Sequence, residues 1–383
     1  MKTILYFQAT GKVSAQHKLE GVYAYGRKHD WDVQVIEPGA SSHKAAELIR
    51  FWTPDGAIVE CGSEQNHFDP AVFGRTPVVF LDRAPNTIKG SAFCIMHDSI
   101  ATARVAAREL LALKLQSYAY VPWPEPRFWS EEREKGFSEA LTLNNRGYSR
   151  FCGKAKSTDV RTLQKELGEW LKGLPKPVGI FAANDLMAGQ VAAAAAREKL
   201  NIPDDIALVG VDNDELLCEN TKPTLSSVMP DFRAAGEMAS AMLARAMNNP
   251  KLKPVTQTFG PRLLVRRASS SRTQGTDREV LAALDLIRRE ACNGLKAKDV
   301  AARFPCSRRM AEIRFRAATG KSPLEAIQEI RRAKALELLA DPTRDRMAIA
   351  NLCGYSSANA LGNFLRRNCP SPDQSAGLPR GAE

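Results

Sequence analysis

The sequence predicts two consecutive α/β units with parallel sheets, followed by a separate all-helical region. First, short β-branched or aromatic runs alternate with alanine-rich amphipathic helices over residues 1–267, a pattern typical of parallel sheets covered on both faces. Second, the stretch 268–276 is small, polar and aperiodic, as a linker would be. Third, the segment 277–370 carries helical patterns, so the chain should hold at least two domains.

The elements of the first region follow one another in a regular order. The six best strand candidates are apolar runs at 3–7, 57–60, 78–81, 118–121, 179–182 and 206–211. Amphipathic helices lie between them, at 99–113, 131–143 and 186–200. Because open α/β sheets bind ligands beyond the carboxyl ends of their strands, the residues directly after each run are the candidate site.

Composition restricts the class of protein. With 44% hydrophobic and 25% charged residues among 383, the chain should fold rather than be disordered throughout. Its apolar runs fall short of the roughly 18 residues that a membrane span needs, and no signal-peptide core follows Lys2. We therefore expect a cytoplasmic protein without membrane contact. The cysteines and histidines lack ligand spacing, so we expect neither a metal nor a cofactor.

The positive charge is concentrated toward the C-terminus. Residues 277–383 hold 19 Lys and Arg against 13 Asp and Glu, within a net charge of +11 for the chain. A basic balance favours a polyanionic partner. Solvated helix faces are the alternative explanation, and charge alone does not separate the two.

Polar side chains that suit a polyhydroxylated ligand follow three of the predicted strands. They are Asp82 and Arg83, Asn184 and Asp185, and Asp212. Carboxylates accept from hydroxyl groups, a guanidinium donates in a planar fork, and an amide does both. Each Asp could instead cap the next helix, but three equivalent strand ends together favour a binding cleft. Strand-end geometry adds weaker candidates, namely Gln8, Glu60 and Trp129, with Phe128 as a further flat apolar surface for a sugar.

This first region resembles the sensor core of LacI/GalR-type regulators. The resemblance rests on the segments 180–188, 206–213 and 225–228, and on Arg133 followed three residues later by Gly136. It implies a periplasmic-binding-protein-like fold in which a three-strand hinge joins two lobes around a sugar. The lobes would comprise about 1–97 plus 228–256, and 98–227 plus 257–267. By resemblance the sugar contacts fall on Asp82, Arg83, Arg133, Asn184 and Asp212.

The resemblance has one large departure. LacI-type regulators begin with a DNA-binding headpiece, whereas this sequence starts directly on the first predicted strand. Either the protein does not bind DNA, or the element that reads DNA lies elsewhere in the chain.

Two helix-turn-helix signals follow the predicted linker. Their helix pairs are 298–303 with 307–318, and 346–353 with 357–368. Ser307 is the expected N-cap of the helix over 307–318, and Gly320 is the expected end of that helix.

The helix over 322–340 lies between the two signals, and Pro323 stands in its first turn. Its apolar residues cover two sides: Leu324, Ile327, Ala335 and Leu338 on one, and Ile330, Ala333 and Leu336 on the other. A helix that is apolar on two sides should be sandwiched between two subdomains. Its length of about 28 Å would hold two recognition helices roughly one turn of B-DNA apart.

This arrangement resembles the AraC/XylS-type DNA-binding domain over 277–370, leaving 371–383 as a disordered tail. The signature segments include 300–302, 307–309, 319–323, 333–339 and 353–357. The resemblance implies that the first recognition helix turns Arg308, Arg309, Glu312 and Ile313 toward DNA, with Ala311 and Phe315 in the core. On the second, Asn359, Gly362 and Asn363 match groove-facing positions. The phosphate contacts would be Arg316, Arg366 and Arg367. The second motif lacks the closing Gly and aromatic–Arg pair of the family, so it should bind DNA more weakly.

Together these features predict a sugar-responsive transcription factor. We expect an activator of a pentose-utilisation operon that binds double-stranded DNA, forms a homodimer, contacts RNA polymerase and has no enzymatic activity. A sugar-binding protein of a transport system is the first alternative. A sugar-metabolising enzyme is the second, although the sequence contains neither a Gly-rich phosphate loop nor a recognisable nucleophile–base pair.

Overall fold

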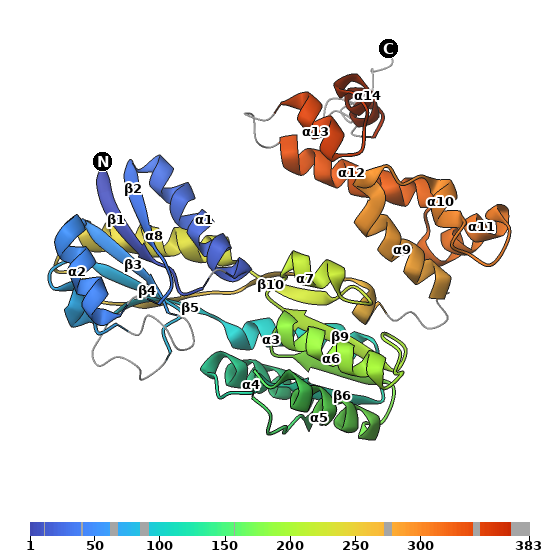
Figure 1. Cartoon of the computed structure of the whole chain (residues 1–383), viewed down its shortest axis with the longest axis horizontal. Helices are drawn as coiled ribbons and strands as arrows, with labels where there is room; N and C mark the ends of the chain where they lie inside the picture. Colours follow the sequence, from blue (N-terminus) through green and yellow to red (C-terminus); the bar gives the residue numbers. More distant parts are fainter. Residues whose placement is uncertain are drawn as a thin grey trace, which may run out of the picture. The chain divides into compact units, whose positions relative to one another are not determined.

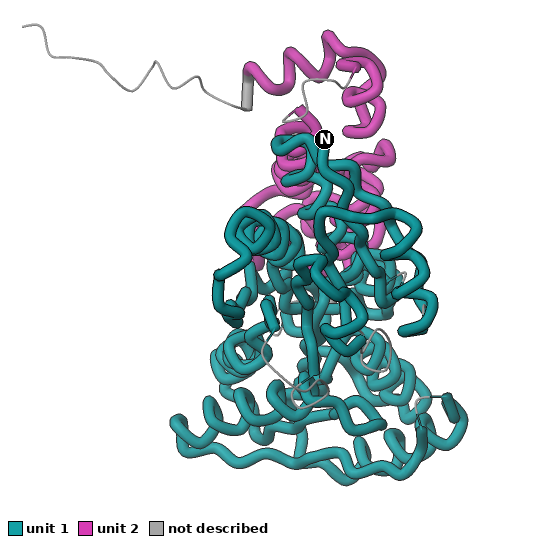
Figure 2. Tube along the Cα trace, turned by 90° about the vertical axis from the view of Figure 1, so that its left-hand side faces the viewer, with its two compact units in different colours: residues 1–272 teal, residues 273–383 magenta. Residues whose placement is uncertain are grey.

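The computed structural model consists of two compact units, Met1–Arg272 and Thr273–Glu383. Figure 2 shows them in different colours. The structure describes residues 1–10, 12–39, 41–61, 68–84, 92–156, 158–271, 278–339 and 345–368. The two units are described separately below.

The first lobe of unit 1 is built on a six-stranded parallel sheet (Figure 1). Its order is β11–β5–β4–β3–β1–β2, with strands β1 Lys2–Phe7, β2 Trp31–Ile36, β3 Gly56–Glu60, β4 Val78–Leu81, β5 Phe93–His97 and β11 Thr256–Phe259. Helices α1 Val13–Lys28 and α8 Phe232–Asn248 pack on one face, and α2 Ser42–Trp52 on the other. Alternate residues of β1 point to opposite faces, Ile4 and Tyr6 toward α8, and Leu5 and Phe7 toward α2.

The second lobe has a sheet of the same size, in the order β12–β10–β9–β8–β6–β7. Its strands are β6 Ser117–Val121, β7 Ser149–Arg150, β8 Val178–Ala182, β9 Ile206–Val211, β10 Ser226–Pro230 and the antiparallel β12 Pro261–Val265. Helices α3 Ser99–Ala112 and α4 Phe128–Thr142 cover one face, and α5 Val160–Gly173 and α6 Asp185–Arg197 cover the other. A short helix, α7 Glu215–Asn220, follows β9.

The chain crosses between the lobes three times. Asp98 follows β5 and caps α3 by accepting from the Ala101 N–H at 2.7 Å, while Asp231 follows β10 and caps α8 in the same way. Their own backbone N–H groups donate to the third crossing, to the carbonyls of Phe259 and Gly260. Aspartates thus start both helices and join the three crossing segments into the predicted hinge.

The last crossing lies later than predicted. The sequence placed it between residues 256 and 257, but Thr256–Phe259 pairs in parallel with β5 and so belongs to the first lobe. The crossing therefore falls at Gly260. The run Thr-Gln-Thr-Phe is short and holds a single apolar residue, which left it without a strand signal.

The first residues of the predicted linker are part of unit 1. Residues Ala268–Ser270 form a short 3-10 helix, η2, and Ser269 and Ser270 are each 1% exposed. The Ser269 hydroxyl donates to the carbonyl of Leu208, and the Ser270 hydroxyl contacts that of Ser226 at 2.9 Å. The small polar composition reflects buried hydrogen bonding here rather than a solvated linker. The remainder of the predicted linker, 272–276, lies outside the described residues.

Unit 2 is helical over its described residues. It comprises α9 Arg278–Glu290, the 3-10 turn η3 Ala291–Asn293, α10 Ala297–Ala301, α11 Arg308–Thr319, α12 Pro323–Leu339, α13 Arg346–Leu352 and α14 Ala358–Asn368. Ser307 caps α11 by accepting from the Met310 N–H, and Gly320 ends it in the left-handed region at φ 73°, as predicted. The predicted tail, 371–383, lies outside the described residues.

Helix α12 connects two separate cores. Ala326 and Ile327 belong to the core of the first helix-turn-helix, and Ala335 and Leu338 belong to that of the second. The sandwiched position is confirmed, but the two-sided apolar pattern is not, because Leu324 and Leu336 are each 51% exposed. The buried side of α12 differs between its two halves: Ala326 and Ile327 face the first core, and Ala335 and Leu338 face the second.

Within the described ranges, the structure contains no helix that is both long and apolar enough to span a membrane.

Candidate functional site

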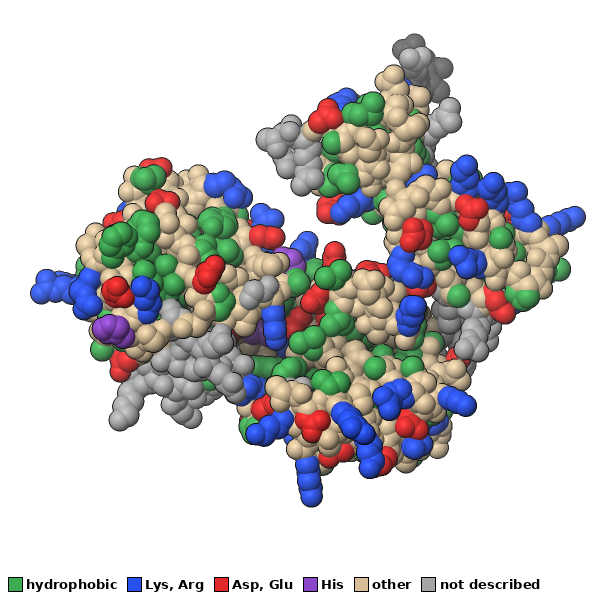
Figure 3. Space-filling view, in the orientation of Figure 1, with side chains coloured by type: hydrophobic (Ala, Val, Ile, Leu, Met, Phe, Trp, Pro, Cys, Tyr) green, Lys and Arg blue, Asp and Glu red, His purple; other side chains and the backbone are tan. Residues whose placement is uncertain are grey.

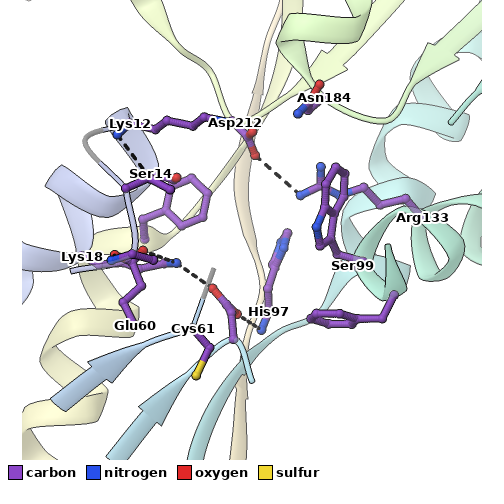
Figure 4. Close-up of a pocket in the computed structure, with 16 residues that line it drawn as sticks. Lys12, Ser14, Lys18, Glu60, Cys61, His97, Ser99, Arg133, Asn184 and Asp212 are labelled. Atoms are coloured by element: carbon purple, nitrogen blue, oxygen red, sulfur yellow. Dashed lines mark hydrogen bonds and ion pairs between the residues drawn. The ribbon is translucent and has the colours of Figure 1, made fainter. Parts of the chain in front are cut away.

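A cleft lies between the two lobes of unit 1, at the carboxyl ends of both sheets (Figure 4). It contains about 830 Å³ of empty space, including the part open to solvent, which is in the size range of small-molecule sites. Its lining comprises Ala9, Thr10, Lys12, Ser14, Lys18, Glu60, Cys61, Asp82, His97, Ser99, Phe128, Trp129, Arg133, Asn184, Asp212 and Phe232. Six of the nine predicted ligand-binding residues are in this lining, namely Glu60, Asp82, Trp129, Arg133, Asn184 and Asp212.

The first lobe contributes a buried ionic cluster. Lys18 of α1 is 4% exposed, and its ammonium lies 3.0 Å from Glu60 Oε1 and 2.6 Å from Asp82 Oδ2. The second oxygen of each carboxylate accepts from a backbone N–H, that of Ala9 for Glu60 and that of His97 for Asp82. Both carboxylates are therefore held in fixed orientations at the ends of β3 and β4.

These contacts determine the charge of each group. Burial alone would raise the pKa of Asp82, but the Lys18 ammonium and the His97 backbone N–H hold it below its ordinary value. Burial, followed by the nearby Arg133 guanidinium, lowers the pKa of His97 to about 3. At neutral pH the cleft thus presents an ionised Asp82 beside a neutral imidazole.

The second lobe contributes Arg133, which α4 carries into the cleft. Its guanidinium donates to the carbonyl of Ala183 and lies 3.5 Å from Asp212 Oδ1. Its Cζ atom is 4.9 Å from the centre of the Trp129 ring, within the range of a cation–π contact. Arg133 is 4% exposed, and its Nε has no hydrogen-bond partner among the described residues.

Asp212 stands in an unusual backbone conformation. Its φ is 108°, and the next residue, Asn213, has φ 50°, which non-glycine residues seldom adopt. The turn brings the Asp212 carboxylate into the cleft toward Arg133 (Figure 4). Burial raises the pKa of Asp212, and the charge of Arg133 opposes that rise.

Asn184 both caps a helix and lines the cleft. Its Oδ1 accepts from the Met187 N–H at 3.0 Å and so caps α6. The same side chain lines the cleft. Neither Asp82 nor Asp212 is the N-cap of a helix in the described part of the chain, whereas Asp214, two residues after Asp212, caps α7.

Three predicted residues are absent from the cleft lining. Asp185 is 2% exposed and faces the interior of the lobe, where it accepts from the Ser227 hydroxyl at 2.6 Å and the Asp214 N–H at 2.9 Å. Arg83 lies over the Phe80 ring and interacts with Cys94. Gln8 donates its backbone N–H to Ile36. Consecutive residues at a strand end point in different directions, so only one of each pair Asp82–Arg83 and Asn184–Asp185 reaches the ligand space.

Sequence reasoning missed Lys18, His97 and Lys12. Lys18 is a single lysine on an amphipathic helix, and no spacing rule marks it as buried. His97 ends β5, which itself was not predicted as a strand. A search for polar residues at the ends of all six parallel strands of the sheet would have found His97.

The first recognition helix of unit 2, α11, presents charged residues to solvent. Arg308, Arg309, Ile313 and Arg316 are exposed and Glu312 is half-buried, while Ala311 and Phe315 are in the core. Arg308 pairs with Glu312 at 3.0 Å, and Arg316 pairs with Glu325 of α12 at 3.2 Å. Figure 3 shows Lys and Arg side chains in blue over the α10–α11 end of the unit.

The second recognition helix, α14, is less basic. Asn359, Asn363 and Arg366 are exposed, and Arg366 donates to Asn363 Oδ1 at 2.5 Å. Gly362 is half-buried. Leu361 is buried and Leu365 packs against the same core. The side chain of Arg367 lies outside the described residues.

Among the described residues, no group of three or more His, Cys, Asp or Glu side chains could hold a metal ion.

Comparison with known proteins extends these observations. A periplasmic binding protein-like domain family matches residues 107–270, and a helix-turn-helix domain family matches 300–370. The chain is 26% identical to a xylose operon regulatory protein of Escherichia coli K12 over 362 residues, which are 92% of this chain and 91% of that protein. It is 28% identical to a xylose operon regulatory protein of Haemophilus influenzae over 266 residues, 69% of each chain. A solved structure of a xylose-binding transcription activator has the same fold, with a TM-score of 0.61, 23% identity and coverage of 97% of this chain and 96% of that one.

Proposed function

We propose that this protein, which joins a periplasmic-binding-protein-like sensor domain to an AraC-type helix-turn-helix domain, controls transcription of a pentose operon in response to xylose or a similar sugar. The observation that carries the proposal is the cleft between the sensor lobes, in a chain that also carries two helix-turn-helix units. The xylose operon regulatory proteins, which align along most of the chain, support the choice of sugar.

The chemistry of the cleft suits a sugar. Asp82, Glu60 and Asp212 offer carboxylate oxygens that accept from hydroxyl groups, and Arg133 and Asn184 offer donors. Trp129 and Phe128 supply apolar ring surface for the C–H face of a pyranose. A ligand of this kind contacts both lobes at once.

Sugar binding would act on the hinge. A ligand that contacts residues of both lobes favours the conformation in which both sets of contacts form, in proportion to its difference in affinity for the two conformations. We propose that the protein is a homodimer in which this change re-spaces the two pairs of recognition helices on DNA half-sites. We further propose that it activates transcription through RNA polymerase, acts in the cytoplasm where its DNA lies, and has no catalytic activity.

The sugar arm of the proposal is tested by calorimetry and thermal shift with a panel of pentoses and hexoses. We expect D-xylose or a close relative to raise Tm in proportion to the logarithm of its concentration above Kd. Absence of binding by every sugar in the panel would refute the sugar-sensor assignment.

The DNA arm is tested by mobility shift on the DNA upstream of the neighbouring sugar-utilisation genes. We expect specific binding whose affinity or pattern changes when the matching sugar is added. Sugar binding without any DNA binding would instead indicate a solute-binding protein. Conversion of the sugar to another compound would indicate an enzyme.

A further inference from the structure

A lysine in the cleft takes no part in the sugar chemistry described above. Lys18 is on α1, and its side chain is 6% exposed. Its ammonium also lies 5.4 Å from the centre of the Phe232 ring of α8. The backbones of α1 and α8 meet at this point, since a Cβ atom placed on Gly236 would lie 1.9 Å from the Lys18 carbonyl oxygen. The helix backbone that carries Lys18 is therefore fixed against α8.

A buried ammonium is costly unless carboxylates compensate it. Lys18 has two such partners, Glu60 at 3.0 Å and Asp82 at 2.6 Å. Without the ammonium, these two carboxylates would face each other across the same small space, and like charges at that range disfavour ionisation of one of them. The cation thus compensates the two carboxylates, which lie at the ends of neighbouring strands.

The contacts also leave Asp82 available to a ligand. Each carboxylate oxygen has two lone pairs, and each oxygen of Asp82 has one donor, Lys18 for Oδ2 and the backbone N–H of His97 for Oδ1. The remaining lone pairs of Asp82 can accept from hydroxyl groups. Their directions are fixed because both oxygens of Asp82 are already held.

The charges in the cleft lining balance. Three cations, Lys12, Lys18 and Arg133, stand against three carboxylates, Glu60, Asp82 and Asp212. His97 is neutral at working pH, because burial and then Arg133 lower its pKa to about 3. A balanced cleft favours a neutral ligand, and loss of Lys18 would leave it with an excess negative charge.

We propose that Lys18 is a positioning residue that sets the specificity of the cleft for a neutral sugar by holding the carboxylates of Glu60 and Asp82 side by side in fixed orientations. The inference rests on the proposed function, since it concerns the same cleft.

The first experiment compares Lys18→Met with the wild type by calorimetry, using D-xylose or whichever sugar of the panel the wild type binds. We expect Kd to rise at least tenfold. Lys28→Met is the matched control, since Lys28 is an exposed lysine in the last turn of the same helix, and it should leave Kd unchanged. An unchanged Kd for Lys18→Met would overturn the inference.

The second experiment measures Kd of Lys18→Met and of the wild type between pH 8 and pH 5. In the variant, Asp82 loses the cation that lowers its pKa, so it takes up a proton at a higher pH than in the wild type, and protonation weakens it as an acceptor. We expect affinity to fall more steeply with falling pH in the variant than in the wild type. The other titratable or charged groups that act on the cluster are Tyr6, Glu60, Cys61, His97, Arg133 and Asp212. All of these are present in both proteins, so parallel pH profiles would contradict the positioning role.

The third experiment is chemical rescue. Lys18→Ala is titrated with ethylammonium chloride, with an equal concentration of sodium chloride as control. We expect the amine, and not sodium, to restore sugar binding, and to restore the fold as well if the variant is unfolded without it. The inference is overturned if the amine does not restore sugar binding, together with the fold where the fold was lost. If the wild type binds no sugar, both the proposed function and this inference are refuted. If the wild type binds a sugar and Lys18→Met binds it equally well, only this inference is refuted.

Discussion

Arg133 concentrates the polar contacts of the second lobe in one side chain. It reaches the Ala183 carbonyl at the end of β8, Asp212 after β9, and the Trp129 ring on its own helix. Since Nε is buried and has no partner among the described residues, a ligand oxygen can complete its hydrogen bonding. A buried donor without a partner costs about 1 to 3 kcal/mol, so a sugar that supplies the acceptor gains affinity.

Removal of Arg133 should therefore weaken sugar binding strongly. For Arg133→Ala we expect a loss of roughly 100-fold in affinity, on the order of 2 to 3 kcal/mol for one charged hydrogen-bonding group, measured by calorimetry. Arg104→Ala is the control, because Arg104 lies at the surface and pairs with Glu139. A sugar-dependent rise in Tm that persists in Arg133→Ala would show that the ligand binds elsewhere.

Asp185 gives the sensor a pH dependence. Burial raises its pKa to about 8, and the charge of Asp212 adds to this effect. The folded state therefore binds a proton that the unfolded state releases at about pH 4, and stability falls as pH rises from there to about 8. We expect Asp185→Asn to reduce the loss of Tm between pH 5 and pH 8, measured by calorimetric scanning. An equal loss in both proteins would assign the pH dependence to other groups.

For single residues, the sequence predicts which residue types stand at the strand ends better than it predicts where their side chains point. Polar groups at the ends of β4, β8 and β9 are visible in the sequence, and one from each reaches the cleft. Which member of a pair does so depends on backbone dihedrals such as φ 51° at Asp82. Those dihedrals are set by tertiary contacts, and no local pattern encodes them.

Among the elements, α1 and α8 approach each other closely at two glycines. A Cβ atom on Gly21 would lie 2.1 Å from the Arg233 carbonyl oxygen, and one on Gly236 would lie 1.9 Å from that of Lys18. Two glycines facing the opposite helix let the backbones touch. That contact fixes the depth at which Lys18 sits below the cleft.

Gly236→Ala should therefore push α1 away from α8. We expect a loss of stability of about 1 to 3 kcal/mol from overpacking, together with weaker sugar binding because Lys18 moves with its helix. Gly173→Ala is the matched control, since nothing lies within 4 Å of a Cβ at that position. Urea unfolding and calorimetry report the two effects, and stability equal to that of the wild type would contradict this packing.

Helix α12 offers a contrast between two leucines two residues apart. Leu338 is 7% exposed in the second core, whereas Leu336 is 51% exposed. We expect Leu338→Ala to cost about 2 to 4 kcal/mol and Leu336→Ala to be nearly neutral, followed as the unfolding transition of unit 2 in the full chain. Equal effects of the two substitutions would mean that α12 is rotated about its own axis relative to the orientation described here.

The elements that sequence reasoning placed correctly are the central ones. The six predicted strands correspond to β1, β3, β4, β6, β8 and β9, which are continuous apolar runs because both faces of the sheet are covered. The missed strands include Ser149–Arg150, which is exposed, and β11, whose exposed residues alternate with less exposed ones. Short edge strands owe their structure to the neighbour that they pair with, so their own sequence carries little signal.

For the molecule as a whole, the combination of two domains was predictable although individual contacts were not. Two independent sets of motifs, one on each side of 268–276, each match a family. The boundary was less predictable, since Ala268–Ser270 has the composition of a linker but is buried. Small polar residues serve both purposes, and their environment decides between them.

DNA binding by the whole chain should depend on the exposed arginines of α11. We expect Arg309→Ala to weaken binding to the operator by about 1 to 3 kcal/mol if Arg309 contacts a base, whereas Arg316→Ala should lower the slope of log affinity against log salt by about one. Mobility shift at several salt concentrations measures both quantities. Arg27→Ala, on the exposed end of α1, is the control. An equal effect of that substitution would indicate that DNA binding depends only on the total charge of the protein.

The three crossings between the lobes also bear on how the protein is made. Strand β1 begins at Lys2, yet α8 and β11, which complete the first lobe, end at Asn248 and Phe259. The core that α8 forms with that sheet includes Phe232, Ala235, Ala239 and Leu243. On the ribosome, the first residues to emerge must therefore wait for segments made more than 200 residues later. Once β10 has been made, the second lobe still needs β12 and η2. The lobe whose synthesis begins first therefore stays incomplete until β11 has been made, and until then the apolar face of its sheet lacks the cover that α8 provides.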